Sequence, residues 1–269
     1  MKNLLAPSVF MLALVFACSS NPYKDTNKAY RKLAKTLIKP LVEVPQVSEI
    51  GKGFEYPIGT INFNLRKPNY VIIHHTAQNA CEQTLKTFTL SKTQVSAHYV
   101  ICKDGTVHHM LNNYLRAWHG GVAKWGSLTD VNSASIGIEL DNNGRETFAE
   151  PQLNSLLILL GKLKKDYNIP TANFIGHSDI APSRKQDPSV FFPWKSLAER
   201  GFGNWQDSIL DSVPVGFNSI QALRLIGYDT KDSVSAIKAF KLHFIQNDVS
   251  PLLKDEDKRV LNNLVRKYN

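Results

Sequence analysis

Two histidines and an aspartate stand where apolar segments of the chain end, and their side chains could bind a metal ion. His74 closes the run 71–74, His177 follows the run 173–176, and Asp187 lies in the loop that continues from His177. Two neutral imidazoles and one carboxylate are typical of catalytic zinc, because they leave a fourth position open for water. The sequence therefore predicts one Zn²⁺ on His74, His177 and Asp187, and hydrolysis is the leading hypothesis for function.

Neighbouring residues offer alternatives to two of these ligands. His75 follows His74 directly, and successive side chains of a strand point to opposite faces, so only one of them should face the site. We favour His74 and expect His75 to pack or hydrogen-bond nearby. Asp179 competes with Asp187, but its place beside His177 better suits loop capping or support of the ligand. Taken alone, His74 is also consistent with a structural histidine at a strand end.

Glu139 and Lys185 carry the side chains that hydrolysis of an amide would need beside such a metal. Ser135, Gly137 and Glu139 share one face of a predicted strand, and the two small residues leave open space that Glu139 overlooks. A carboxylate there could take a proton from water and deliver it to a leaving amine. A solvated strand face is the alternative. Lys185 lies two residues before Asp187, so an extended backbone places its ammonium beside the metal, where it could stabilise an oxyanion.

The elements that must position these residues alternate between strands and helices from residue 69 to about 205. Predicted strands cover 71–74, 98–102, 106–111, 135–140 and 173–176, and the Asp-Gly pair at 104–105 is typical of a hairpin. Helices are predicted over 82–90 and 153–167, the second beginning after Pro151 and ending before Pro170. Mixed strands with covering helices predict an α/β domain.

Both ends of the chain differ from this central region. Residues 18–45 are expected to be a tether with one short helix near 27–33, broken by Pro40 and Pro45. After Trp205 only helices are predicted, over 219–226 with Gly227 as C-cap, about 234–244 and about 260–268. These predict a small three-helix module, either separate from or docked on the α/β domain.

Composition limits the class of partner. The 269 residues suffice for one good-sized domain plus a small one. The net charge is +9, of which Lys2 is the only charge within residues 1–17, and a basic surface suits an anionic polymer, an anionic lipid or a nucleic acid. Because no basic cluster interleaved with aromatic residues is present, we expect no nucleic-acid partner.

The N-terminus has the pattern of a targeting segment. Lys2 precedes an apolar stretch that is too short to span a bilayer and that ends at Cys18. The run Val15-Phe16-Ala17-Cys18 resembles the lipobox of bacterial lipoproteins, although Phe16 is larger than the usual residue. This resemblance implies a signal peptide over 1–17 and a lipid anchor on Cys18; an ordinary signal peptide is the alternative. Export would permit disulfides, so Cys81 and Cys102 either pair or remain buried free thiols.

Six motifs between Asn69 and Trp205 resemble one family. They are VIIHHTA, VSAHYVI, DGTV, AWHGG, SIGIEL and GHSDIAPSRKQDP, in that order. Together they resemble the zinc-dependent N-acetylmuramoyl-L-alanine amidases, whose superfamily also contains peptidoglycan-recognition proteins. The resemblance implies a mixed central β-sheet flanked by helices, zinc on the three ligands above, Glu139 as acid and base, and Lys185 as oxyanion partner.

The same resemblance implies the substrate and the residues that bind it. The bond cut would be the amide between N-acetylmuramic acid and L-alanine of the stem peptide, in peptidoglycan or muropeptides. The residues expected to bind substrate are His98, Trp118, His119, Asn132 and Arg184. The motifs ALRLIGYD, AIKAFKLHF and VLNNLVRKY resemble a three-helix peptidoglycan-binding domain, so the predicted domains are 46–205 and 206–269.

The order of signal, amidase and wall-binding module resembles outer-membrane lipoprotein amidases, which implies the cell envelope, facing the periplasm. Two other functions compete with the amidase: a non-catalytic lipoprotein that recognises peptidoglycan, and a peptidase that cuts within the stem. Loss of a ligand or of Glu139 would favour the non-catalytic protein. All of these residues are present, so the sequence favours the enzyme.

Overall fold

The computed structural model describes residues 21–42, 60, 62, 64–65 and 67–268, which fall into two compact units, 1–63 and 64–269. In the first unit, helix α1 (Lys24–Ile38) is followed by the short helix η1 (Lys39–Leu41). Helix α1 is longer than the predicted segment 27–33, because no glycine or proline interrupts the chain before Pro40. The predicted signal peptide over 1–17 and Cys18 lie outside the described residues.

A five-stranded mixed sheet forms the centre of the second unit. Its strands are β1 (Tyr70–His75), β2 (Tyr99–Ile101), β3 (Val107–His109), β4 (Ser135–Leu140) and β5 (Phe174–Gly176), in the order β3-β2-β4-β1-β5. Strands β2, β4, β1 and β5 run parallel, and β3 pairs antiparallel with β2 across the predicted hairpin. The prediction of a mixed sheet flanked by helices is confirmed.

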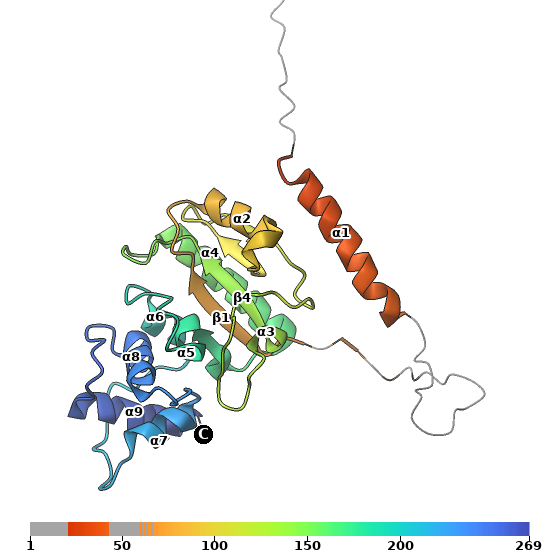
Figure 1. Ribbon diagram of the computed structural model, residues 1–269. Coiled ribbons are helices and arrows are strands. Elements are labelled where there is room, and N and C mark those ends of the chain that lie inside the picture. Colours follow the sequence, from red (N-terminus) through yellow and green to blue (C-terminus); the bar gives the residue numbers. More distant parts are fainter. Residues whose placement is uncertain (1–20, 43–59, 61, 63, 66, 269) are drawn as a thin grey trace, which may run out of the picture. The chain divides into compact units, whose positions relative to one another are not determined.

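Helix α4 (Glu150–Tyr167) covers one face of this sheet (Figure 1). Its leucines 156, 160 and 163 are fully buried against Val71 and Ile73 of β1 and Ile136 and Ile138 of β4. Pro151 lies in its first turn and the helix ends before Pro170, as predicted; Asn168 ends it in the left-handed conformation. Among the described residues, no helix combines the length and the apolar character needed to cross a membrane.

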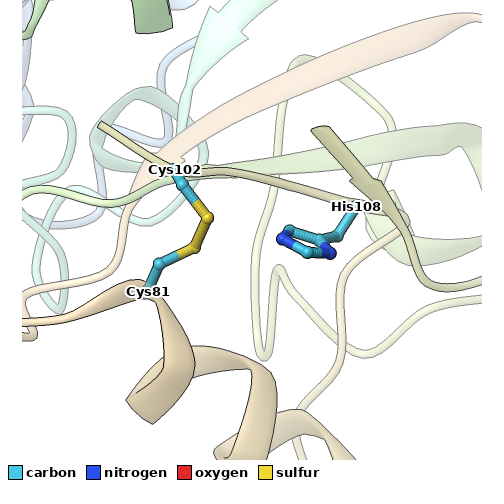
Figure 2. Close-up of side chains that lie close together, drawn as sticks. All are labelled: Cys81, Cys102 and His108. Atoms are coloured by element: carbon cyan, nitrogen blue, oxygen red, sulfur yellow. A yellow bond between two sulfur atoms is a disulfide. The ribbon is translucent and has the colours of Figure 1, made fainter. Parts of the chain in front are cut away.

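Short helices connect the strands. They are α2 (Cys81–Thr89), η2 (Ser91–Thr93), α3 (Val131–Ala134), η3 (Thr171–Asn173), α5 (His177–Ile180) and α6 (Trp194–Ala198). Cys81 at the start of α2 forms a disulfide with Cys102 after β2, which decides the alternative that the sequence left open (Figure 2). His108 of β3 lies close to both sulfurs. Because the sulfurs are bonded to each other, this trio does not present the thiolates that a metal would require.

The predicted C-terminal helices are α7 (Ser219–Ile226), α8 (Ser233–Phe244) and α9 (Asp255–Tyr268), gathered together in Figure 1. The side chains of Asn218 and Asp232 cap α7 and α8. The three helices do not form a separate core. Leu223, Phe240 and Leu261 join Ile72 and Ile175 in one apolar cluster on the face of the sheet opposite α4. The module is therefore docked on the α/β region.

Candidate active site

Three parallel strands deliver the predicted metal ligands and Glu139 to one edge of the sheet. His74 of β1 is directly opposite Glu139 of β4. Gly176 of β5 is paired with Ile73, so His177 is the next residue beyond that strand. The carboxyl ends of parallel strands meet at the same edge, which is the usual place for a site in an α/β sheet. Strand order alone thus places His74 between Glu139 and His177.

The side chains of His74, His177 and Asp187 converge on one point. Nδ1 of His74 lies 2.9 Å from Nδ1 of His177 and 3.3 Å from Oδ2 of Asp187. Nδ1 of His177 lies 3.1 Å from the same carboxylate oxygen. The backbone N–H of Ser178 donates to the carbonyl of Asp187, at 2.8 Å, and so ties together the two loop segments that carry the second and third ligands.

Hydrogen bonds behind the site determine which ring nitrogen of His74 faces it. Ser135 Oγ donates to the carbonyl of Val131, so it accepts from Nε2–H of His119, 3.2 Å away. Nδ1 of His119 is then an acceptor, and Nε2–H of His74 donates to it over 3.1 Å. Nδ1 of His74 therefore carries a lone pair. Nε2–H of His177 donates to the carbonyl of Gly120, which leaves a lone pair on its Nδ1 as well.

This donor set fits zinc. Two imidazole lone pairs and a carboxylate oxygen within 3.3 Å of one another repel unless a cation lies between them. Zinc binds such nitrogen and oxygen ligands at about 2.0–2.2 Å. Burial lowers the pKa of His74 to about 4, which keeps its ring in the neutral form that a metal requires. The described residues hold no ligand set of this kind elsewhere, apart from the disulfide trio.

Glu139 has the environment of a proton-transfer group. Burial and the nearby charge of Asp187 raise the pKa of its carboxyl to about 8, against the opposing effect of Lys185. Its Oε1 lies 3.9 Å from Nδ1 of His74, and its Oε2 has no hydrogen-bond partner among the described residues. A carboxyl beside the ligands, not committed to other groups, can exchange a proton with a substrate.

The site opens into a cleft of about 750 Å³. Glu139, Lys185 and Asp187 lie in its wall together with three of the residues predicted to bind substrate, Trp118, His119 and Arg184. The indole of Trp118 is 48% exposed and so is free to contact a ligand. The guanidinium of Arg184 donates to the carbonyls of Gly120 and Val122, so it also braces the loop that bears His119.

The structure places His98 and Asn132 behind the cleft. Nδ1 of His98 accepts the N–H of Gly137, and its Nε2–H donates to the carbonyl of Leu115, so the buried ring is fully engaged. Oδ1 of Asn132 accepts the backbone N–H groups of His119 and Gly120. Neither residue lines the cleft, and the side chain of each instead makes hydrogen bonds to the backbone of a neighbouring segment. Both support neighbouring segments in this structure, and their predicted contact with substrate stays a prediction.

The two alternative ligands have other roles. Nδ1 of His75 accepts the N–H of Ser189, so this ring hydrogen-bonds nearby as predicted. Oδ2 of Asp179 accepts the N–H of Gly176 and so caps α5. Asp179 also contacts two side chains from the C-terminal module, Tyr228 after α7 and His243 of α8.

The sequence did not predict that some residues would line the cleft. Thr84, Thr87 and Phe88 of α2 form part of the wall, and Leu242 of α8 and Val249 form another part. No motif or spacing marks these residues, because packing of the surrounding elements alone brings them to the cleft.

Comparisons with known proteins agree with this geometry. Residues 64–190 match a family model described as N-acetylmuramoyl-L-alanine amidase. The chain is 31% identical to the N-acetylmuramoyl-L-alanine amidase AmiD of Escherichia coli over 230 residues, covering 74% of this chain and 82% of that protein. It is 37% identical over 103 residues to the 1,6-anhydro-N-acetylmuramyl-L-alanine amidase AmpD of Haemophilus influenzae, covering 38% of this chain and 56% of that protein.

Solved structures show the same fold over most of the chain. AmiD from E. coli, in complex with anhydro-N-acetylmuramic acid-L-Ala-D-γ-Glu-L-Lys, has a TM-score of 0.69 at 27% identity and covers 82% of this chain and 97% of its own. AmpDh3 from Pseudomonas aeruginosa also has a TM-score of 0.69 at 27% identity, covering 81% and 99%. With the ligand geometry and these relatives together, the chain belongs to the family of N-acetylmuramoyl-L-alanine amidases.

Proposed function

We propose that this chain hydrolyses the amide bond between the lactyl group of N-acetylmuramic acid and the L-alanine of the peptidoglycan stem peptide. The observation that carries the proposal is the convergence of His74, His177 and Asp187 beside the unpaired carboxyl oxygen of Glu139, in a cleft. The names of the relatives and the muropeptide complexes of AmiD and AmpDh3 support this substrate class.

His74, His177 and Asp187 would hold one zinc ion. When bound, zinc supplies Lewis acidity to the scissile carbonyl and lowers the pKa of a water molecule. The protein's contribution is to keep the three donors together and to turn the Nδ1 lone pairs of the two imidazoles toward one another and toward Asp187. The hydrogen bonds from His74 to His119 and from His177 to Gly120 perform the second task.

Glu139 moves the proton and Lys185 stabilises charge. The carboxylate of Glu139 accepts a proton from the attacking water and gives it to the departing alanine nitrogen. Lys185 lies in the same wall of the cleft, where its ammonium stabilises the negative charge that develops on the carbonyl oxygen. Arg184 adds positive charge at this wall, which suits the carboxylates of the stem peptide.

The test is mass analysis of purified peptidoglycan after digestion by residues 19–269, with and without a zinc chelator. We expect intact stem peptides that begin at L-alanine, lost on chelation and restored by zinc. Cuts inside the stem would identify a peptidase instead. Binding without release, by a protein shown to contain zinc, would identify a recognition lipoprotein.

A variant separates chemistry from metal binding. Glu139→Gln should lower turnover by at least about 100-fold, because the amide cannot exchange the proton, while zinc content stays unchanged. A variant that retains turnover within a few fold would remove Glu139 from the mechanism.

The N-terminal sequence supports a second part of the proposal: the chain is exported, lipidated on Cys18 and held at the outer membrane facing the periplasm. The lipobox-like run 15–18 and the short apolar segment before it are the support. Labelling of cells with a radioactive fatty acid should mark the wild-type protein and not Cys18→Ser. Equal labelling of both, or fractionation of the wild type with soluble proteins, would contradict the anchor.

A further inference from the structure

The C-terminal helices contact both chain segments that carry the second and third zinc ligands. We propose that α8, with Tyr228 and Gln246 beside it, positions His177 and Asp187, so that this module is part of the zinc site and not only a wall-binding attachment. The inference rests on the proposed zinc function, and the added residues act on the ligands through Asp179 and through the segment that follows Asp187.

The first contact is a buried carboxylate next to His177. Asp179 is 0% exposed and lies two residues after His177 in the single turn of α5. Its Oδ2 accepts the N–H of Gly176 and Nδ1–H of His243, each at 2.7 Å, and its Oδ1 accepts the hydroxyl of Tyr228 at 2.7 Å. Two of its three donors therefore come from the module. Because the third donor is the backbone just before His177, the position of Asp179 determines the position of that ligand.

The second contact follows Asp187. The side-chain amide of Gln246, which lies just beyond α8, donates to the carbonyls of Val190 and Phe192, at 3.0 and 2.7 Å. These two carbonyls belong to the segment that leads away from Asp187. The ring of His243 also stacks on Trp194, with centroids 3.9 Å apart and planes 17° apart. The loop that bears Asp187 is therefore held from the same side as α5.

The module also reaches the cleft itself. Leu242, which precedes His243 in α8, and Val249 line the wall that includes Lys185 and Asp187. Residues that hold metal ligands from behind usually change metal affinity by about 10- to 100-fold when they are lost. A role limited to core packing would instead lower stability without a specific effect on zinc.

His243 allows these two roles to be separated. Its Nε2 has no hydrogen-bond partner among the described residues, so His243→Phe keeps the stacked ring and removes only the bond to Asp179. His243→Asn does the reverse, since its amide N–H replaces the Nδ1 donor but the ring is lost. Tyr228→Phe removes the second donor. Tyr268→Phe is the matched control, because this buried hydroxyl of α9 has no hydrogen-bond partner in the described chain.

The experiment measures zinc affinity by competition with a chromophoric chelator, and thermal unfolding of the metal-free form, for the chain 19–269. We expect zinc to bind at least about tenfold more weakly to His243→Phe and Tyr228→Phe. His243→Asn should bind zinc more tightly than His243→Phe although it unfolds at a lower temperature, and Tyr268→Phe should match the wild type.

Wild-type zinc affinity in both His243→Phe and Tyr228→Phe would overturn the inference, and so would affinities that simply follow the unfolding temperatures. The proposed function fails by a different result, namely a wild-type chain that binds zinc and releases no stem peptide. A wild-type chain that binds no zinc would overturn both.

Discussion

At the residue scale, Gly137 leaves room for the ring of His119. A Cβ built at position 137 would lie 2.4 Å from Cγ of that ring, so only glycine leaves room for it. The sequence indicated open space above Ser135 and Gly137, and the structure fills that space with His119. Because His119 accepts from His74, the missing Cβ of Gly137 contributes to the orientation of a proposed zinc ligand.

We predict that Gly137→Ala weakens zinc binding by about tenfold or more, because the added methyl displaces His119 from His74. Chelator competition measures this directly. Gly161→Ala is the control, since a Cβ there meets only Phe202 at 4.0 Å, and it should leave zinc affinity unchanged. Equal affinities for Gly137→Ala and the wild type would show that His119 does not orient His74.

A second prediction concerns His98 and acid. Burial lowers the pKa of His98 to about 4. An unfolded histidine has a pKa near 6.5, so the unfolded chain binds more protons between these values and stability falls as the pH falls through them. The loss reaches about 3 kcal/mol. Denaturant unfolding of the metal-free chain at pH 7 and pH 4.5 measures this loss of stability. The free energy of unfolding should fall less between these two pH values for His98→Gln than for the wild type. Equal losses of stability in the wild type and His98→Gln would show that other groups cause the acid sensitivity.

At the scale of elements, the disulfide joins α2 to the end of β2, and α2 forms part of the cleft wall. The loop between Cys81 and Cys102 contains η2 and the segment that leads into β2. The bond therefore restricts both the helix that lines the cleft and one side of the sheet.

We predict that Cys81→Ser with Cys102→Ser lowers the free energy of unfolding by about 3 kcal/mol, the value expected for a closed loop of this length. The Michaelis constant for muropeptide should also rise, because α2 is held less firmly. Urea unfolding and steady-state kinetics measure the two effects. Reduction of the wild type should lower the free energy of unfolding by the same amount. Unchanged stability in the double variant and in the reduced wild type would mean that the fold holds α2 without the bond.

At the scale of the whole molecule, the face of the sheet opposite α4 is buried by side chains of the C-terminal helices. Ile72 and Ile175 are fully buried in a cluster that Leu223, Phe240 and Leu261 complete. Lys241, also 0% exposed, is neutralised within the module by Asp248 and Asp257 at 2.8 and 3.1 Å. The apolar surface that the helices cover is therefore an interior surface.

We predict that a chain ending at residue 205 does not fold stably, because removal of the helices exposes this face to water. Soluble yield and thermal unfolding provide the measurement, with the chain 19–269 as reference. A truncated chain that unfolds cooperatively at the reference temperature would show that the α/β region is independent of the module.

Patterns local in the sequence determined the strands, the helices and the residue types of the site. The apolar runs that end in His74 and before His177 became parallel strands, and the leucine spacing after Pro151 became α4, because side-chain periodicity decides which face of an element is buried. Register then follows from burial, so Glu139 came to lie opposite His74.

Only the tertiary structure decided which groups meet across long stretches of chain. The sequence could not show that Cys81 pairs with Cys102, that His98 and Asn132 bond to backbone groups behind the cleft, or that His243 reaches Asp179. Each of these depends on how elements pack, which is determined by the shape and apolar area of both partners together and leaves no short-range pattern in either.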